Sequence, residues 1–244
     1  MFGALANWVL GYAEQALASG DEGIGLAERL AHPLSLEDSL LNLSLLHLDR
    51  GEPDLALQRL DAAQALAAEQ RLGFVREPRF IRGAALIAQG AVVEGVNYLR
   101  EGLGTAVGRG VWRTFGFASL ANGLMRIGKL DEALAKIAEG LQRMETKGER
   151  LWSAELHRIK GVVLFRQNNP EQSQIAFEEA LRAARKQRAK AYELRAATSL
   201  ARFWGEQGRR TEARGLLAPV YGWFTEGFTT ADLKEAKALL DELG

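Results

Sequence analysis

The chain has 244 residues, with 31 Lys and Arg against 31 Asp and Glu, 47% apolar residues and no cysteine. This length supports one large domain or one array of small units, and the lack of cysteine excludes disulfides, thiolate chemistry and the usual sulfur ligands of zinc. Because the formal charge is zero and no apolar run approaches the roughly 20 residues of a membrane span, we expect a cytoplasmic protein that binds neither nucleic acid nor membrane.

Six segments of the chain share one register, in which a Gly or Asn is followed five residues later by a small residue. Consecutive small residues are 40, 39, 38, 40 and 40 positions apart, a regularity typical of an internal repeat. The six pairs are Gly11/Ala16, Gly51/Ala56, Gly90/Gly95, Gly128/Ala133, Asn168/Ser173 and Gly208/Ala213.

Each repeat carries two apolar stripes with helical spacing. One stripe follows the small residue by four positions, at Leu60, Leu99, Ile137, Phe177 and Leu217. The other precedes it and has its own small residue near the middle, at Ser44, Gly83, Ala121, Gly161 and Ala201. Small residues let helix backbones approach closely, and Gly or Asn supplies a left-handed turn. We therefore predict pairs of antiparallel helices that stack into a solenoid.

The N-terminal end, Met1 to Leu10, is predicted to be the remnant of a first helix whose unit continues at Gly11. A truncated first unit leaves apolar surface uncovered, and we expect Trp8 to be exposed there. The sequence therefore predicts a homodimer formed through the exposed N-terminal end.

Two glycine-rich stretches in the middle of the chain imitate nucleotide-binding motifs. Gly123 to Leu130 resembles a P-loop, but Leu130 stands where a Ser or Thr hydroxyl must hold magnesium. Gly102 to Gly108 imitates a dinucleotide fingerprint without its βαβ setting, and we expect it to end a helix loosely. Neither stretch predicts a cofactor. No metal site is expected either, because the histidines lie far apart in the sequence: His32, His47 and His157.

Charge is divided unevenly along the chain. Residues 1–110 contain 9 basic and 14 acidic residues, or −5, and residues 111–244 contain 22 and 17, or +5. The densest basic stretch, from His157 to Arg214, is interpreted as a solvated helical surface. Several aromatic residues of this half recur at helix packing positions and are expected in the core: Trp112, Trp152, Trp204, Tyr221, Trp223 and Phe224.

The C-terminal end is predicted to be a closing helix. Thr229 and Asp232 have the spacing of a capping box. A one-sided apolar stripe follows at Leu233, Ala236, Leu239 and Leu240. We therefore divide the chain into a helical repeat array over residues 1–228 and a capping helix over residues 229–244.

The order of small, apolar and turn residues resembles the tetratricopeptide repeat (TPR). The resemblance is best in two units, at Gly161, Leu164, Ser173, Phe177 and Ala180, and at Leu200, Ala201, Trp204, Ala213 and Leu217. It implies an all-α, right-handed superhelical solenoid of about six antiparallel helix pairs. The family's unit has about 34 residues, so a spacing near 40 implies longer helices or loops. The chain is similar to the long-repeat variant in bacterial signalling ATPases, including the maltose-type activators.

A second resemblance covers residues 145–244. The strings AELHRIKG, AYELRAATSLARFW and LLAPVYGWFTEGFTTADLKEAKALLDEL are similar to the C-terminal TPR region of rhizobial-type multidomain proteins. Those proteins carry an adenylate or guanylate cyclase or a DNA-binding module, then an AAA-like ATPase, then the repeats. The resemblance implies neighbouring ATPase or cyclase domains as partners within a parent protein.

The TPR resemblance also implies a binding surface, because the first helix of each pair lines the concave side in that family. Transferring its inward-facing offsets gives a basic face with an apolar patch, which suits an acidic peptide or protein segment. An ordinary solvated face is the alternative. The residues concerned are Asn122, Met125, Arg126, Glu155, Arg158, Phe165, Arg166, Arg195, Arg202 and Glu206.

The leading functional interpretation is a non-catalytic scaffold for protein recognition, acting as the regulatory or sensor part of a larger bacterial signalling protein. No nucleophile elbow, HExxH motif or framed pair of catalytic carboxylates is present in the sequence, so we assign no catalytic residue. Two alternatives remain open: a small-molecule sensor of a STAND-type regulator, which needs an enclosed pocket lined by aromatic and convergent polar groups, and a structural self-association module.

Overall fold

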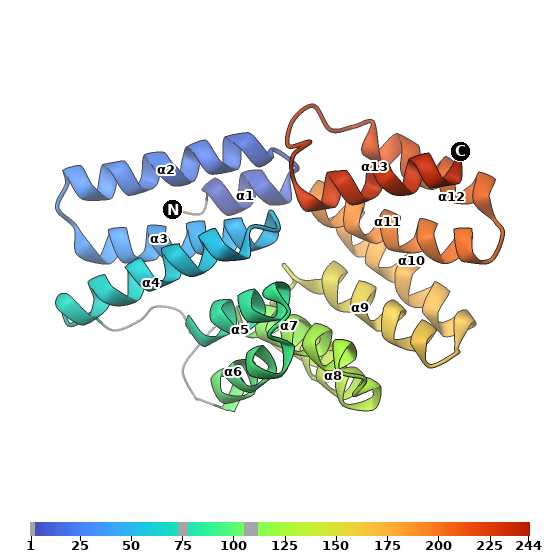
Figure 1. Ribbon diagram of the computed structural model, residues 1–244, viewed down its shortest axis with the longest axis horizontal. Helices are drawn as coiled ribbons and strands as arrows, with labels where there is room; N and C mark the ends of the chain where they lie inside the picture. Colours follow the sequence, from blue (N-terminus) through green and yellow to red (C-terminus); the bar gives the residue numbers. More distant parts are fainter. Residues whose placement is uncertain (1–2, 73–77, 105–111) are drawn as a thin grey trace.

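The computed structural model describes residues 3–72, 78–104 and 112–244, and these residues form α-helices without a strand (Figure 1). None of the described helices combines the length and the apolar character that a bilayer crossing requires. The helices are α1 (Gly3–Val9), α2 (Ala13–Arg29), α3 (Pro33–Asp49), α4 (Pro53–Glu69), α5 (Pro78–Gln89), α6 (Val92–Gly104), α7 (Trp112–Arg126), α8 (Leu130–Lys147), α9 (Ser153–Arg166), α10 (Pro170–Lys186), α11 (Lys190–Glu206), α12 (Arg210–Tyr221) and α13 (Ala231–Leu243).

The helices pair as the sequence predicts, because each expected turn residue adopts a left-handed conformation. At Gly51 the N–H bonds the carbonyl of Leu48 at 3.0 Å, and the N–H of Glu52 bonds that of His47 at 2.8 Å. This double closure is the Schellman motif, which stops a helix and reverses the chain. The predicted turn residues have positive φ throughout: Gly11 (97°), Gly51 (81°), Gly90 (95°), Gly128 (79°), Asn168 (59°) and Gly208 (79°).

Three of the connections between pairs use the same turn, which the sequence did not reveal. Non-glycine residues take the left-handed conformation there, at Ala31, Arg71 and Arg188. α10 and α11 each have 17 residues, and three residues separate α10 from α11 and α11 from α12. Helix plus turn therefore spans 20 residues in this part of the array, which explains a unit near 40.

Paired helices cross at two small residues, and all of these residues are buried. Ser44 Oγ donates a hydrogen bond to the carbonyl of Ala56 at 2.6 Å, and Ser173 Oγ donates to that of Gly161 at 2.8 Å. The hydroxyls therefore enter the helix contact without an unsatisfied polar group. The crossing pairs are Ser44/Ala56, Gly83/Gly95, Ala121/Ala133, Gly161/Ser173 and Ala201/Ala213, and the larger side chains beside them are equally buried. The predicted α-solenoid of six helix pairs is confirmed.

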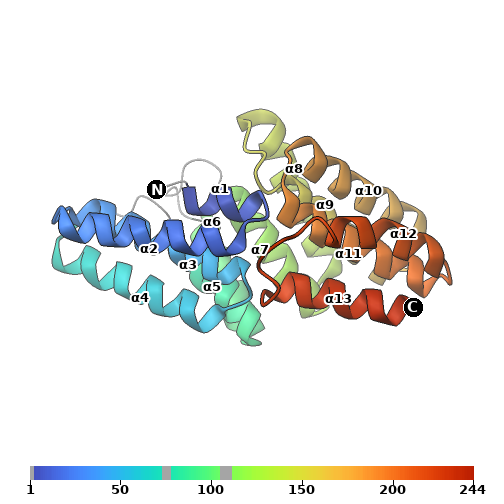
Figure 2. The same ribbon diagram turned by 90° about the horizontal axis from the view of Figure 1, so that it is seen from above.

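The array curves until its two ends meet. In both views the start of α2 approaches the connection between α12 and α13 (Figure 1, Figure 2). There the Glu226 carboxylate accepts hydrogen bonds from the backbone N–H groups of Glu14 (2.9 Å) and Gln15 (3.2 Å). In addition, the N–H of Ala231 bonds the carbonyl of Arg50 at 3.3 Å. The concave side is therefore bordered by helices from both ends of the array.

Because the two ends of the array meet, the N-terminal end is more buried than the sequence predicts. Trp8 is 3% exposed, and Ala4 and Leu5 are also buried. α1 packs against α2, α3 and α11, so these apolar side chains already have a partner within the chain. The prediction that Trp8 is exposed is wrong, because no local pattern indicates that the far end of the array covers it.

The C-terminal helix α13 buries the predicted stripe, and its capping differs from the prediction. The N-cap is Thr230, whose Oγ1 donates to the carbonyl of Gly227 at 2.7 Å without capping the helix by its side chain. Asp232 binds Arg195 at 2.7 Å. The capping box of Thr229 and Asp232 is therefore wrong.

The close approach of paired helices predicts opposite effects for two glycine substitutions. A Cβ on Gly83 would lie 2.7 Å from the Gly95 carbonyl oxygen, whereas a Cβ on Gly215, within α12, would meet nothing within 4 Å. We expect Gly83→Ala to lower the free energy of unfolding by about 1–3 kcal/mol. Gly215→Ala should raise it by up to about 1 kcal/mol. Urea denaturation measures both, and a stabilising Gly83→Ala would contradict the crossing geometry.

Candidate functional site

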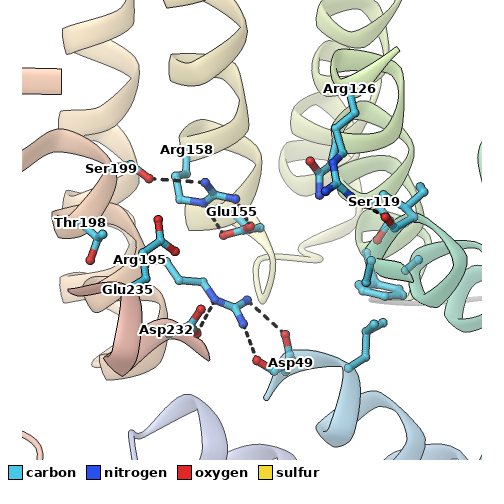
Figure 3. A pocket seen from close by; sticks show the side chains of 16 residues that line it. Asp49, Ser119, Arg126, Glu155, Arg158, Arg195, Thr198, Ser199, Asp232 and Glu235 are labelled. Carbon is cyan, nitrogen blue, oxygen red and sulfur yellow. Dashed lines mark hydrogen bonds and ion pairs between the residues drawn. The ribbon is translucent and has the colours of Figure 1, made fainter. Parts of the chain in front are cut away.

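The concave side contains a cavity of about 280 Å³ (Figure 3). Its walls come from the first helix of five pairs, α3, α5, α7, α9 and α11, and from the closing helix α13. A smaller hollow of about 70 Å³ shares Ser119 and Asn122 with it and reaches Trp152. Binding sites for drug-sized ligands span about 300–1,000 Å³, so this cavity suits one side chain or a short segment.

The structure brings half of the predicted groove residues into this cavity. They come from α7, α9 and α11, as the assignment of the first helices to the concave side requires. The lining members of the predicted set are Asn122, Arg126, Glu155, Arg158 and Arg195.

The other half of the predicted set does not line the cavity. Met125 is 8% exposed, and its carbonyl accepts a hydrogen bond from Arg166 Nη1 at 3.1 Å. The Phe165 ring packs edge-on against Phe203, with centroids 5.2 Å apart. The remaining two are Arg202, which binds Glu235 at 2.7 Å, and Glu206, which is exposed.

Three acidic residues of the cavity were missing from the predicted set. Asp49 comes from α3, and Asp232 and Glu235 come from α13. With Glu155 they give four carboxylates against the three guanidinium groups of the wall. The cavity therefore has one carboxylate in excess, and the expectation of a basic concave face is wrong. No local pattern marks these residues, because closure of the array brings them here.

Arg195 joins three helices at the floor of the cavity. Its Nη1 lies 3.1 Å from Asp49 Oδ1, and its Nε lies 2.7 Å from Asp232 Oδ2 (Figure 3). Its Nη2 also donates to the Asp49 carbonyl at 2.7 Å. The guanidinium carbon lies 6.0 Å from the centroid of a Trp8 ring and 5.8 Å from that of Tyr192. One side chain of α11 thus binds the ends of α3 and α13 and contacts α1.

A second ion pair lies beside it within α9. Arg158 Nε donates to Glu155 Oε2 at 3.0 Å, and Arg158 Nη1 reaches Ser199 Oγ at 3.4 Å. Burial raises the pKa of Glu155, but the charge and hydrogen bonds of Arg158 outweigh it and hold this pKa below its ordinary value. Because Arg158 is already engaged, it is not a free cation for an acidic ligand.

The pKa of Asp49 moves in the opposite direction. Burial raises it from 3.8 to about 6 even though Arg195 lowers it, and the nearby charges of Asp232 and Glu155 raise it further. Burial also raises the pKa of Asp232. Three neighbouring carboxylates, of Asp49, Glu155 and Asp232, therefore face only two guanidinium groups, those of Arg158 and Arg195.

Some polar groups of the wall have no partner within the described chain. Thr198 is 5% exposed and Asp49 7%, yet Thr198 Oγ1 and Asp49 Oδ2 form no hydrogen bond there. Ser119 and Asn122 are half-buried at the wall. Buried polar groups normally have partners, so this wall is suited to recognition by hydrogen bonds. In the described ranges no three side chains converge as metal ligands.

The sequence motifs that imitate nucleotide sites have structural explanations. Gly128 of the P-loop-like stretch forms the turn between α7 and α8, with no strand before it. In the other stretch α6 ends at Gly104, and residues 105–108 lie outside the described residues.

Comparisons with solved structures place this chain in the TPR fold. The complex of NprR with its cognate peptide NprX matches with a TM-score of 0.66 and 14% identity, over 100% of this chain and 72% of that one. A thermophilic TPR protein of Thermus thermophilus matches with a TM-score of 0.58 and 18% identity, over 85% of this chain and 98% of that one. At these identities the likeness shows the fold alone.

The chain spans 41% of one matching chain in the APC/C hetero-tetramer Cut9–Hcn1, with a TM-score of 0.62, 12% identity and 98% of this chain covered. No protein-family model and no curated protein sequence matches it.

The ion pairs of Arg195 predict a large loss of stability when this residue is truncated. Arg195→Ala leaves Asp49 and Asp232 buried without their cation, and we expect the free energy of unfolding to fall by about 3–5 kcal/mol. Arg202→Ala removes an exposed ion pair between α11 and α13. This change should alter the free energy of unfolding by less than about 1 kcal/mol. Equal effects in urea denaturation would show that Arg195 does not hold the closure.

The raised pKa of Asp49 predicts a pH-dependent effect of Asp49→Asn. Between about pH 4 and 6 the folded chain holds a proton that the unfolded chain has lost, so this carboxyl makes unfolding easier as the pH rises. Asn cannot bind this proton, so the free energy of unfolding of the variant should rise relative to that of the parent across this pH range. Asp21→Asn, at an exposed position, is the control. If the difference in unfolding free energy between Asp49→Asn and the parent stayed constant with pH, the raised pKa of Asp49 would be contradicted.

Proposed function

We propose that this chain is a non-catalytic recognition module that binds a peptide or protein segment in the central cavity. The observation that carries the proposal is the concave wall of first helices, with buried polar groups that lack partners within the described chain at Asp49 and Thr198. Such a wall offers hydrogen-bonding groups at a fixed spacing, and its rigidity limits the ordering that binding requires.

Two observations define the kind of segment. The cavity holds both guanidinium groups and carboxylates, most of them paired with one another. Its volume admits one or a few side chains. We therefore infer a polar segment, with no preference for an acidic one. The solved complex of NprR with its cognate peptide supports peptide binding by this fold.

The wider context follows from the sequence resemblances. We propose that the array is the regulatory or sensor part of a larger bacterial signalling protein in the cytoplasm, and that its neighbours are ATPase or cyclase domains. The segment bound in the cavity would then come from such a domain or from a separate partner. Binding would act on the neighbouring domains through the closed array.

A small-molecule sensor is the second candidate function, and the cavity itself favours it. This alternative requires an enclosed pocket lined by aromatic and convergent polar groups. The cavity is partly open, but Phe115, Ser119, Asn122 and Thr198 supply lining groups of these kinds. The homodimer through the N-terminal end loses much of its physical basis, because Ala4, Leu5 and Trp8 of α1 are buried within the chain.

Filling the cavity tests the proposal. Asn122 lines the cavity on α7, whereas Asn97 is exposed on the outer helix α6. Peptides that bind the full chain are first selected from a displayed random library. Their affinities are then measured for the parent chain, for Asn122→Phe and for Asn97→Phe. We expect Asn122→Phe to weaken binding at least about tenfold with an unchanged melting temperature, and Asn97→Phe to have no effect.

Two outcomes would overturn the proposal. One is a library that yields no binder although the chain is folded. The other is a set of binders that Asn122→Phe leaves untouched. A ligand found only in a thermal-shift screen of sugars and nucleotides, and lost in Asn122→Phe, would replace the peptide by a small molecule at the same site.

A further inference from the structure

A second hollow, of about 400 Å³, lies on the outer surface where the ends of the array meet. Leu10 and Tyr12, at the turn between α1 and α2, form one side of it. Trp223, just after α12, forms another, and the end of α10, the following turn and the start of α11 supply the rest. We call this hollow the seam pocket. It shares no lining residue with the central cavity.

The apolar side of the seam pocket is packed through ring contacts. The ring of Trp223 lies 5.7 Å from that of Tyr12 and 5.2 Å from that of Phe224, centroid to centroid. Gly11 lets the indole approach the turn closely, because a Cβ there would lie 2.6 Å from the Trp223 ring. Even so, Trp223 is 37% exposed and Leu10 is 41% exposed. A fixed, half-exposed indole is a frequent anchor of protein interfaces.

The polar side of the seam pocket is basic. Arg185, Arg188 and Lys190 line it together with a single carboxylate, Glu193. Glu193 is 6% exposed and accepts hydrogen bonds from Arg185 at 2.9 Å and Lys190 at 2.7 Å. Lys190 Nζ also lies 5.2 Å from the centroid of a Trp223 ring. The three cations exceed the one carboxylate by two charges.

Arg188 is the cation that remains available. It is exposed, and within the described ranges its side chain forms no ion pair or hydrogen bond. Its backbone is fixed by the left-handed turn, with φ of 55°. A charged side chain on a fixed turn, beside a fixed indole, defines a site with an anionic and an apolar subsite.

We propose that the seam pocket docks an acidic protein segment that carries an aromatic or aliphatic side chain. The apolar side chain would pack on Trp223 and Leu10, and a flanking carboxylate would pair with Arg188. The central cavity, with four carboxylates and three guanidinium groups, has no comparable excess of cations. A nucleic acid is disfavoured because it needs cations spaced along a phosphate backbone, whereas these are gathered at one pocket of a chain with zero net charge.

The test uses two labelled peptides of opposite charge, Glu-Glu-Tyr-Glu-Glu and Lys-Lys-Tyr-Lys-Lys, with fluorescence anisotropy on the full chain. We expect only the acidic peptide to bind, and its affinity to fall between about 50 and 300 mM salt. Arg188→Glu should weaken it about tenfold or more. Arg71→Glu is the matched control, because Arg71 is exposed in the equivalent left-handed turn far from the seam.

The proposal fails if the acidic peptide does not bind, if both peptides bind alike, or if Arg71→Glu weakens binding as much as Arg188→Glu. It also fails if single-stranded DNA displaces the peptide and binds more tightly. Asn122→Phe should leave the acidic peptide bound, since it lies at the other site. The Asn122→Phe measurement tests the two sites separately. Failure of the proposal for the seam pocket would therefore leave the proposed function of the central cavity unaffected, and the reverse.

Discussion

The close approach of paired helices at small residues is the constraint on which the rest of the structure depends. With only hydrogen, methyl or hydroxymethyl groups at the crossing, the backbones come near enough for Ser44 and Ser173 to bond the facing carbonyls. Larger side chains such as Leu60 and Phe177 then fill the space beside the crossing. Because the repeat spacing is nearly constant, each pair meets the next in a similar way. The curvature of a solenoid is the sum of these small rotations.

That accumulated curvature brings together two halves of opposite charge. Residues 1–110 have a formal charge of −5 and residues 111–244 of +5. At the floor of the cavity Arg195, from the basic half, binds Asp49, from the acidic half, 146 residues away. Burial of these charges is unfavourable by itself, so the pair contributes mainly by fixing which surfaces meet. Closure thereby converts an open groove into a cavity.

The sequence predicts the elements whose causes are local. Turn residues such as Gly51 and Asn168, and crossing residues such as Gly83, follow from a spacing that one helical hairpin must satisfy. The turns at Arg71 and Arg188 were not predicted, because arginine, unlike glycine or asparagine, is not a residue type that indicates a left-handed backbone conformation. Hence the half-period of 20 residues became visible only in the structure.

The candidate site was predicted only in part, because its assembly is not local. Arg195 and Glu155 follow from their positions on first helices. Asp49 and Asp232 reach the cavity only through closure, and Trp8 is buried for the same reason. Phe165 was placed in the groove because offsets from an open superhelix were transferred to a closed one. The charge of the cavity therefore cannot be inferred from a single repeat.

The central cavity and the seam pocket share one wall, helix α11. Glu193 bonds Arg185 and Lys190 at the seam pocket, and Arg195, two residues later on the helix, bonds Asp49 and Asp232 at the cavity. Each hollow also needs residues from both ends of the array, so neither is complete when the ends part. A ligand that contacts both ends binds the closed arrangement in preference to an open one. By linkage, ligands at the two sites would then strengthen each other through the shared closure, with no direct contact between them.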